Sequence, residues 1–489
     1  MEVKSRKSSI TLRENQAPHF KRLVDIITNN HTWMDGSSMG TGKTWITGAL
    51  AINFQMPLHV ICPKNVASVW TSMAAAVGLD LFVYTYDSFR GTRTKQPSCG
   101  LLERRDIQIT NAKGNISLVP QFFSTQLLRD IIDKGAFFIF DEAHKLKHKS
   151  TQFLAGQIIA KMILSSPKGI SRVGLLSGTM YDKKKCVIQF LKLMGYIFDE
   201  DLKFNFGEVV EVSNVYNRKE TSKILDSDVG LLDIIYKLYI GVILPRILSV
   251  ADAPKLTVNV RNGFFHMDIS SVKQMLEAMN DLINKAKFQL EAFNRALMKI
   301  EIAKLPTLVR LAKDKLKESP DCKVVLFVNY KSSIEFLKTE MAEYNPLIYF
   351  GGVKSSVREE AIKKFQEPTN EFRLLILTIQ SGSVGISLHD TDGRFPRYVF
   401  GIPRFSAIDM QQATYRVFRD GMKSPAYVTY VYDIRTGEIE LSIQRALAEK
   451  SKILKDQVLN KTDVTYPDEY EIYKEPKIVE RKSKIIVKE

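Results

Sequence analysis

The sequence is poor in the features that mark secreted, zinc-binding and membrane-embedded proteins. Its 489 residues include only four cysteines, which lack the spacing of a disulfide framework or a zinc site. No uninterrupted apolar stretch approaches the roughly 18 residues that a membrane-spanning helix needs. The first residues, Met-Glu-Val-Lys-Ser-Arg-Lys, lack the apolar core of a signal peptide. We therefore expect a soluble intracellular chain with no membrane partner.

Acidic residues are also in deficit. The chain has 70 Lys and Arg against 54 Asp and Glu, which gives a formal net charge of +16. A surplus of this size attracts polyanions, so nucleic acid is the first candidate partner and an anionic membrane surface the second. A basic surface without any partner would have the same composition, and the oligomeric state stays open.

Short apolar runs rich in Val, Ile and Phe, each followed by a helix-like segment, predict an α/β fold. Fully apolar strands that alternate with helices are typical of parallel sheets covered on both faces. The runs fall into two groups, before about residue 180 and after about residue 320, so we expect two α/β lobes. The clearest runs are residues 58–62, 136–140, 173–176, 324–328, 374–377 and 398–402.

The region between the two groups has helical periodicity. Apolar residues three and four positions apart predict a long amphipathic helix that ends before Pro306. A further helix is expected from Glu440 to about Leu459, followed by a Lys-rich tail. The residues of the central stripe are Met275, Met279, Leu282, Ala286, Phe293, Leu297 and Ile300.

Residues 37–44, Ser-Ser-Met-Gly-Thr-Gly-Lys-Thr, have the pattern of a phosphate loop that opens a helix. Gly40 and Gly42 let the backbone, with Thr41 between them, turn so that its N–H groups converge on phosphate oxygens. We expect Lys43 to reach the β and γ phosphates of ATP and Thr44 to bind Mg²⁺. Because a Gly-Lys-Thr tripeptide also occurs by chance, this motif needs a second one beside it.

The second motif is Asp141-Glu142-Ala143-His144, which follows an apolar strand. Ligand sites in open α/β sheets lie at the carboxyl ends of the strands. Asp141 is expected to hold the Mg²⁺, and Glu142 to orient and deprotonate the attacking water. A lone Asp-Glu pair after a strand is common, but a phosphate loop about a hundred residues upstream makes chance improbable.

The order and content of these motifs resemble those of superfamily two helicases. Ser177-Gly178-Thr179 stands where the third motif of that superfamily couples hydrolysis to the nucleic-acid site. Leu12-Arg13-Glu14-Asn15-Gln16 resembles the element whose glutamine, here Gln16, contacts adenine. The resemblance implies nucleic-acid contacts for Pro63 and Lys64, within Cys62-Pro63-Lys64, and for Tyr86, within Thr85-Tyr86-Asp87.

The segment from Gln412 to Arg419 resembles the sixth helicase motif, Gln-x-x-Gly-Arg-x-x-Arg, with Tyr415 in place of Gly. On a helix, Gln412, Arg416 and Arg419 would share one face. The resemblance implies that Gln412 binds the nucleotide and that the two arginines neutralise charge on the γ-phosphate.

Three features resemble the Swi/Snf branch of the superfamily. They are Leu244-Pro245-Arg246 followed by Ala253-Pro254-Lys255, the pattern from Gly351-Gly352 through Arg358 to Phe365, and the motif from Ser381 to Leu388. In that last motif, Ser381 and Gly382 are expected at nucleic acid and Gly385 at the nucleotide. Ser383 and Ser387 replace the Gly and Asn of the family.

The resemblance implies two RecA-like parallel-sheet lobes joined by a helical region. The expected parts are residues 1–195, the ATP-binding lobe; 196–305, a largely helical insert and linker; 306–440, the second lobe; and 441–489, a helical brace and basic tail. The compact size and the run from Asp35 to Thr44 resemble helicases of large DNA viruses and phages. A viral chain would work in the host nucleus, the host cytoplasm or the virion.

The expected function is an ATP- and Mg²⁺-dependent motor on nucleic acid, most readily a double-stranded DNA translocase that could serve transcription or replication machinery. Two alternatives stay open. One is a strand-separating DNA or RNA helicase, although no element that would separate strands is evident. The other is a non-hydrolysing binding module of a transcription or replication complex, against which the chemically competent catalytic residues argue.

Overall fold

The computed structural model describes residues 1–4, 8–38, 40–110, 116–196, 230–251, 259–267, 270–271, 273–274, 277–278, 290–382, 386–404, 406–419, 421–434, 449–450, 452–453, 456 and 471–475. The chain divides into two compact units. The first is Met1–Lys255 with Lys450–Val464, and the second is Leu256–Glu449 with Thr465–Glu489. The four-part division expected from the sequence stays a prediction.

The first unit is built on a six-stranded parallel sheet in the order β10-β3-β9-β8-β4-β5. Its central strands are buried along their whole length, as expected where helices cover both faces. This arrangement confirms the parallel α/β class and three of the predicted strands. The strands are β3 (Thr32–Asp35), β4 (Leu58–Cys62), β5 (Leu81–Thr85), β8 (Phe137–Asp141), β9 (Arg172–Leu176) and β10 (Leu248–Ser249).

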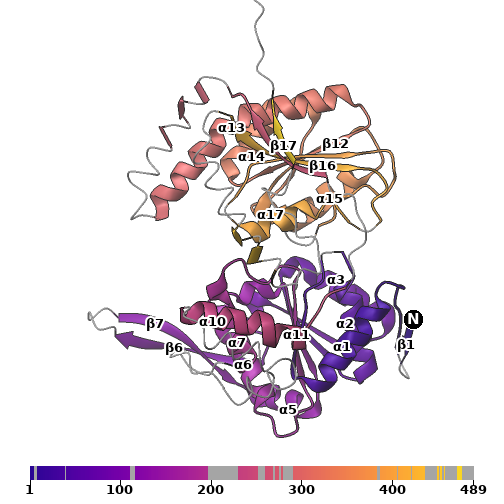
Figure 1. Cartoon of the computed structure of the whole chain (residues 1–489), viewed down its shortest axis with the longest axis vertical. Helices are drawn as coiled ribbons and strands as arrows, with labels where there is room; N and C mark the ends of the chain where they lie inside the picture. Colours follow the sequence, from indigo (N-terminus) through magenta and orange to yellow (C-terminus); the bar gives the residue numbers. More distant parts are fainter. Residues whose placement is uncertain are drawn as a thin grey trace, which may run out of the picture. The chain divides into compact units, whose positions relative to one another are not determined.

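Helices cover the two faces of this sheet (Figure 1). On one face, α1 (Ala17–Asn29), α2 (Lys43–Phe54) and α3 (Ala67–Val77) pack on β3, β4 and β8 in a continuous apolar core. On the other face, α6 packs so closely that a Cβ on Gly156 would meet the Phe140 ring at 3.3 Å. The remaining helices are α4 (Tyr86–Arg90), α5 (Gln126–Lys134), α6 (Thr151–Leu164), α7 (Val187–Leu193), α10 (Leu231–Leu238) and α11 (Leu244–Ile247).

Two hairpins complete the first unit. Strands β1 (Glu2–Lys4) and β2 (Ser9–Thr11) pair at the N-terminus. Strands β6 (Leu102–Thr110) and β7 (Ile116–Ser124) form a nine-pair antiparallel hairpin that projects from the unit (Figure 1). The hairpin lies in the chain between α4 and α5.

The second unit has a seven-stranded parallel sheet in the order β13-β14-β12-β15-β16-β11-β17. Three of its strands confirm predicted runs, and β17 was not predicted. The strands are β11 (Asn259–Phe265), β12 (Lys323–Val328), β13 (Leu347–Tyr349), β14 (Leu374–Thr378), β15 (Arg397–Gly401), β16 (Ala426–Asp433) and β17 (Glu471–Lys474). The helices are α13 (Leu290–Glu318), α14 (Lys331–Glu340), α15 (Ser355–Gln366), α16 (Ile379–Gly382) and α17 (Ala407–Thr414).

Helix α13 corrects one expectation. The helix does not end before Pro306 but continues through it to Glu318. Pro306 lies on the exposed side, while Leu305, Leu308 and Ala312 are buried in the core of the unit. Packing of this face compensates for the backbone hydrogen bond that proline removes.

Two other expectations fall largely outside the described residues. They are the first half of the predicted amphipathic stripe, which includes Met275, Met279, Leu282 and Ala286, and most of the predicted helix from Glu440 to about Leu459. Within the described part of the chain, no helix has the length and apolar character to cross a membrane.

Candidate nucleotide-binding and coupling sites

The predicted phosphate loop joins the carboxyl end of β3 to the first turn of α2. Gly40 and Gly42 have φ angles of 83° and 87°, in the left-handed region that side chains rarely adopt. Gly42 directly precedes α2, so the unpaired N–H groups of the first helical turn face the loop. Thr41 is buried and Thr44 is half-buried in that first turn. This geometry suits the binding of an anionic phosphate group.

Lys43 and Gln16 both contact the loop. The Lys43 Nζ donates to the carbonyl oxygens of Ser37 and Ser38, at 2.8 and 3.0 Å. The Gln16 Nε2 donates to the Thr41 carbonyl at 2.9 Å. Its Oε1 accepts from the Arg13 N–H at 3.1 Å. The structure therefore brings Gln16 from the chain ahead of α1 to the loop, as the predicted motif requires.

A buried polar network behind the loop was not foreseen from the sequence. The Asp35 carboxylate accepts from the Ser37 N–H at 2.9 Å and lies 3.1 Å from the His19 Nε2. The other ring nitrogen of His19 contacts the Ser249 hydroxyl at 2.8 Å. Burial opposes ionisation of Asp35, but the nearby His19 and Lys43 hold its pKa below the usual value. This network fixes the start of the loop against the edge strand β10.

Ser37, the first residue of the phosphate loop, connects the loop to a distant segment through its side chain. Its side chain is fully buried, and its hydroxyl accepts from the Ala251 N–H at 2.8 Å. The hydroxyl thus ties the phosphate loop to the segment that follows β10. A glycine or alanine could not make this bond.

Asp141 lies at the carboxyl end of β8, on the same edge of the sheet as the phosphate loop. Its Oδ2 accepts from the indole N–H of the buried Trp70 at 2.8 Å, and its Oδ1 accepts from the Glu142 N–H at 2.9 Å. Burial and the neighbouring charge of Glu142 raise the pKa of Asp141 to about 6, against the opposing effects of Trp70 and Lys43. The carboxylate is therefore positioned and in need of a positive partner, which fits a Mg²⁺ ligand.

Glu142 connects the strand end to the predicted coupling motif. Its backbone is left-handed, with φ 53°, a conformation that is costly for a non-glycine residue and that recurs at functional sites. The Glu142 Oε2 lies 3.2 Å from the His144 Nδ1, which also lies 3.4 Å from the Ser177 hydroxyl. The Ser177 hydroxyl accepts from the Thr179 N–H at 3.2 Å, across Gly178. A continuous chain of polar contacts thus runs from Glu142 to Thr179.

The residues predicted at nucleic acid differ in exposure. Lys64 is exposed directly after β4, whereas Pro63 is buried. Tyr86 is only 3% exposed, and its hydroxyl donates to the Asp141 carbonyl at 3.0 Å. In this placement Tyr86 supports the end of β8, and of this group only Lys64 presents a side chain at the surface.

In the second unit, the helix that carries Gln412 is shorter than the motif required. Helix α17 ends at Thr414, so Arg416 and Arg419 do not continue one helical face with Gln412. The Thr414 hydroxyl bonds back to the Met410 carbonyl and also contacts the Tyr430 hydroxyl. These side-chain bonds compete with continuation of the helix.

The two arginines nevertheless converge on one segment. The Arg416 Nη1 donates to the Ile386 carbonyl at 3.3 Å, and the Arg419 Nη1 donates to the Ser387 hydroxyl at 2.7 Å. Ser387, which replaces the family's Asn, thus holds a predicted catalytic arginine. Gln412 is fully buried in α17.

The other motif residues of this unit lie after β14. The Ser381 N–H donates to the Thr378 hydroxyl at 3.2 Å. Gly382 is buried, and a Cβ there would clash with the side chains of Phe327 and Leu377. Gly385 lies outside the described residues.

Comparison with known proteins finds sequences similar to this chain among helicases and DNA repair proteins. Residues 303–421 match the family model "Helicase conserved C-terminal domain". A putative ATP-dependent RNA helicase of Acanthamoeba polyphaga mimivirus is 24% identical over 465 residues, which cover 91% of this chain and 83% of the viral protein. The DNA repair and recombination protein RAD54 of Saccharomyces cerevisiae is 27% identical over 152 residues, and the DNA repair protein RAD5 of Cryptococcus neoformans 28% over 161 residues. The chain is similar to helicase-like ATPases, including Swi/Snf-type proteins.

The matched segments cover 31% and 32% of this ATPase but only 16% and 13% of RAD54 and RAD5. The SWI2/SNF2 ATPase core of Sulfolobus solfataricus is similar to it at a TM-score of 0.33 and 16% identity, over 96% of this chain and 93% of the archaeal one. The viral relative agrees with the expected resemblance to helicases of large DNA viruses. Proteins of this kind use ATP, and the chain is a nucleic-acid-dependent ATPase.

Proposed function

We propose that this Swi/Snf-type ATPase translocates along double-stranded DNA and couples each step to ATP hydrolysis. The observation that carries the proposal is the chain of contacts from Glu142 through His144 to Ser177 and Thr179. It joins the predicted hydrolytic carboxylate to the motif predicted to report on nucleic acid. RAD54 and RAD5, which are DNA repair proteins by name, support DNA as the track.

In the proposed site, the loop N–H groups and Lys43 hold the ATP phosphates, with Gln16 at the adenine. Thr44 and Asp141 would hold Mg²⁺, which would supply a Lewis acid that neutralises developing charge. Glu142 orients the attacking water and accepts its proton. Because the Lys43 cation already bonds two loop carbonyls, phosphate binding exchanges these partners for a charged one.

The second unit supplies the remaining cations in this proposal. Arg416 and Arg419, held by residues 386 and 387, are the groups that would act on the γ-phosphate when ATP is bound. Residues 386 and 387 follow the motif around Ser381 and Gly382 in the chain. This motif is the proposed nucleic-acid contact of the second unit.

In this proposal, Lys64 is the residue of the first unit that contacts the DNA backbone. It is exposed at the carboxyl edge of the sheet and is a phosphate contact in this proposal. Phosphate contacts do not depend on base sequence, and each one steepens the salt dependence of binding. Lys161, which is exposed near the end of α6, serves as a control of equal charge in another element.

The proposal is tested by triplex displacement with wild type, Lys64→Ala and Lys161→Ala. We expect the wild type to displace a third strand from a duplex without unwinding a blunt duplex. Lys64→Ala should raise the DNA concentration for half-maximal ATPase and reduce the salt slope by about 1, while Lys161→Ala should match wild type. Failure of the wild type to displace the third strand while it hydrolyses ATP would exclude translocation on duplex DNA.

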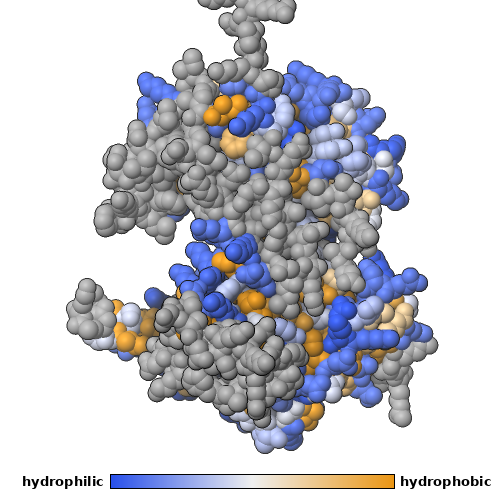
Figure 2. Space-filling view, in the orientation of Figure 1, coloured by the Kyte–Doolittle hydropathy of each residue, from blue (hydrophilic) through white to orange (hydrophobic). Residues whose placement is uncertain are grey.

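A second candidate function, strand separation, is favoured by the β6–β7 hairpin. The hairpin follows closely after α4, and its base is anchored there by the Arg104 guanidinium, which donates to the Gly91 carbonyl at 3.2 Å. Ile116 and Leu118 near its distal end are 63% and 46% exposed, and Figure 2 shows hydrophobic residues on this projecting arm. An exposed apolar arm is the kind of element that can hold two strands apart. The mimivirus relative is also named as an RNA helicase.

The double substitution Ile116→Ser and Leu118→Ser distinguishes the two functions. Both side chains are exposed, so the fold should be retained. Loss of tailed-duplex unwinding with unchanged nucleic-acid-stimulated ATPase would establish strand separation by the hairpin. Unchanged triplex displacement, with no unwinding by either protein, supports the translocase.

A further inference from the structure

A small polar cavity opens at the edge of the first sheet opposite the phosphate loop. Thr32, the first residue of β3, lies on its wall, whereas Asp35 at the other end of the strand leads into the phosphate loop. A four-residue strand separates the two by about 10 Å. The cavity is therefore distinct from the nucleotide site.

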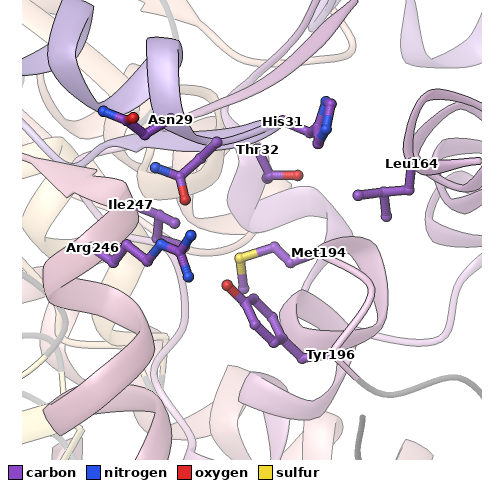
Figure 3. Close-up of a pocket in the computed structure, with 9 residues that line it drawn as sticks. Asn29, His31, Thr32, Leu164, Met194, Tyr196, Arg246 and Ile247 are labelled. Carbon is purple, nitrogen blue, oxygen red and sulfur yellow. The ribbon is translucent and has the colours of Figure 1, made fainter. Parts of the chain in front are cut away.

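The cavity measures about 100 Å³, several times the space that one ordered water needs. It reaches the surface at Asn29, which is exposed. Figure 3 shows the Arg246 and Tyr196 side chains on one side, with Thr32, His31 and Leu164 around the rest of the space. The lining residues are Asn29, Asn30, His31, Thr32, Leu164, Met194, Tyr196, Arg246 and Ile247.

Arg246 gives the cavity a positive charge. It is half-buried, and no carboxylate of the described residues lies within 4.0 Å of its guanidinium. None of the residues that line the cavity is acidic. Burial and the neighbouring Arg172 lower the pKa of His31, so its ring stays neutral at pH 7 and the charge of the site is that of Arg246.

Thr32 supplies a second, independent sign of a ligand. The residue is 6% exposed, and its Oγ1 has no hydrogen-bond partner among the described residues. Buried hydroxyl groups in native proteins almost always have a hydrogen-bond partner, because an unpaired hydroxyl loses its hydrogen bonds to water and gains none in the protein. The Asn29 and Asn30 amides each donate one N–H to a carbonyl of α1 and retain a second N–H.

We propose that this cavity binds a small anion, a phosphate or carboxylate group held by the Arg246 guanidinium and the Thr32 hydroxyl. A planar guanidinium pairs with either group through two parallel hydrogen bonds. The apolar residues of the lining, Leu164, Met194 and Ile247, accommodate a short carbon chain on the ligand. Both anions share this chemistry, and their relative affinity tells which one the site prefers.

The site is linked to the nucleotide loop through the chain itself. Arg246 lies three residues before Ser249, whose carbonyl accepts from the Gly36 N–H at 3.0 Å and whose hydroxyl contacts His19. An anion that orders the Arg246 segment therefore also orders the strand against which the phosphate loop is held.

Thermal denaturation with inorganic phosphate or isobutyrate tests the proposal. All proteins carry Lys43→Ala, which weakens phosphate binding at the nucleotide loop and leaves any remainder equal in every variant. We expect one of the two anions to raise the melting temperature by about 2–5 °C at saturating concentration. Arg246→Gln should abolish the rise in melting temperature. Sodium chloride at equal ionic strength should not reproduce it.

Thr32→Val separates a ligand site from a merely hydrated hydroxyl. Valine has the same shape, so the variant should be at least as stable as its parent without anion and should lose most of the anion-dependent rise. An equal rise in the parent, Arg246→Gln and Thr32→Val would overturn the proposal, as would the absence of any rise with both anions. A destabilised Thr32→Val with an undiminished rise would also overturn it, since the hydroxyl would then bond a water.

Discussion

Replacement of Ser37 by alanine should destabilise this protein. The Ser37 hydroxyl accepts from the Ala251 N–H at 2.8 Å and lies 3.3 Å from the His19 Nε2. Ser37 is fully buried and Ala251 only 2% exposed, so water cannot replace the lost acceptor. The variant leaves a buried N–H without a partner in the segment that flanks the phosphate loop.

The magnitude follows from that one donor. A buried backbone N–H deprived of its acceptor costs about 1–3 kcal/mol. Ser37→Ala leaves no cavity larger than a hydroxyl, and the bond from the Ser37 N–H to Asp35 is retained. A loss of about 2 kcal/mol corresponds to a fall of roughly 4–8 °C in the melting temperature of a unit of this size.

Circular dichroism during heating measures this change, and ATP binding reports on the loop. Ser38→Ala is the matched control, because Ser38 is the next residue of the loop and contributes its carbonyl, not its hydroxyl, to Lys43. We expect Ser38→Ala to have the melting temperature of the wild type. Ser37→Ala should have a lower melting temperature and bind ATP more weakly. Equal melting temperatures for the two variants would refute the role given to the Ser37 hydroxyl.

Three further outcomes are expected. Glu142→Gln should bind ATP normally but hydrolyse it at least about 100-fold more slowly, as single-turnover kinetics will show; near wild-type turnover would remove Glu142 from the role of base. Arg419→Ala should lower kcat far more than ATP affinity, because the cation acts as charge develops, and equal losses in both would indicate a ground-state clamp. Burial lowers the pKa of Lys304 to about 7. The burial of the charged Lys304 therefore destabilises the folded state fully below pH 7, and this destabilisation disappears as the pH rises from 7 towards 10.5. The unfolding free energy of the wild type should increase over this range, and Lys304→Met should show a smaller increase between pH 7 and 10. Parallel pH profiles of the two proteins would contradict this.

Three parallel strands in each sheet were predictable because they read as unbroken apolar runs, as in residues 137–140 and 324–328, which are buried on both faces. The β6–β7 hairpin was not, since most of its residues are exposed and it contains no long unbroken apolar run. Strand β17 pairs with β11, about 210 residues earlier, and so depends on a partner that local pattern does not reveal. The predicted helix end before Pro306 was wrong because the tertiary packing of α13 outweighs the local tendency of proline to end a helix.

The phosphate loop and the strand-end carboxylates could be located from sequence because their chemistry lies in contiguous residues. Their supports could not. Trp70 and His19 reach the site from other elements, and neither belongs to a motif that marks it as a partner of Asp141 or Asp35. The prediction that Gln412, Arg416 and Arg419 share one helical face was wrong, because side-chain hydrogen bonds of Thr414 end the helix. The two arginines still converge, since both donate hydrogen bonds to residues 386 and 387.

ATP turnover measured at matched salt with no nucleic acid, blunt duplex DNA, single-stranded DNA and single-stranded RNA tests the central claim most directly. The translocase account predicts the largest stimulation with duplex DNA and a steep decline as salt increases, since each phosphate contact releases counterions. Translocation requires grip on phosphates but no separation of bases, so single strands should stimulate less. Greater stimulation by single-stranded RNA than by duplex DNA would contradict the account and favour the strand-separating helicase.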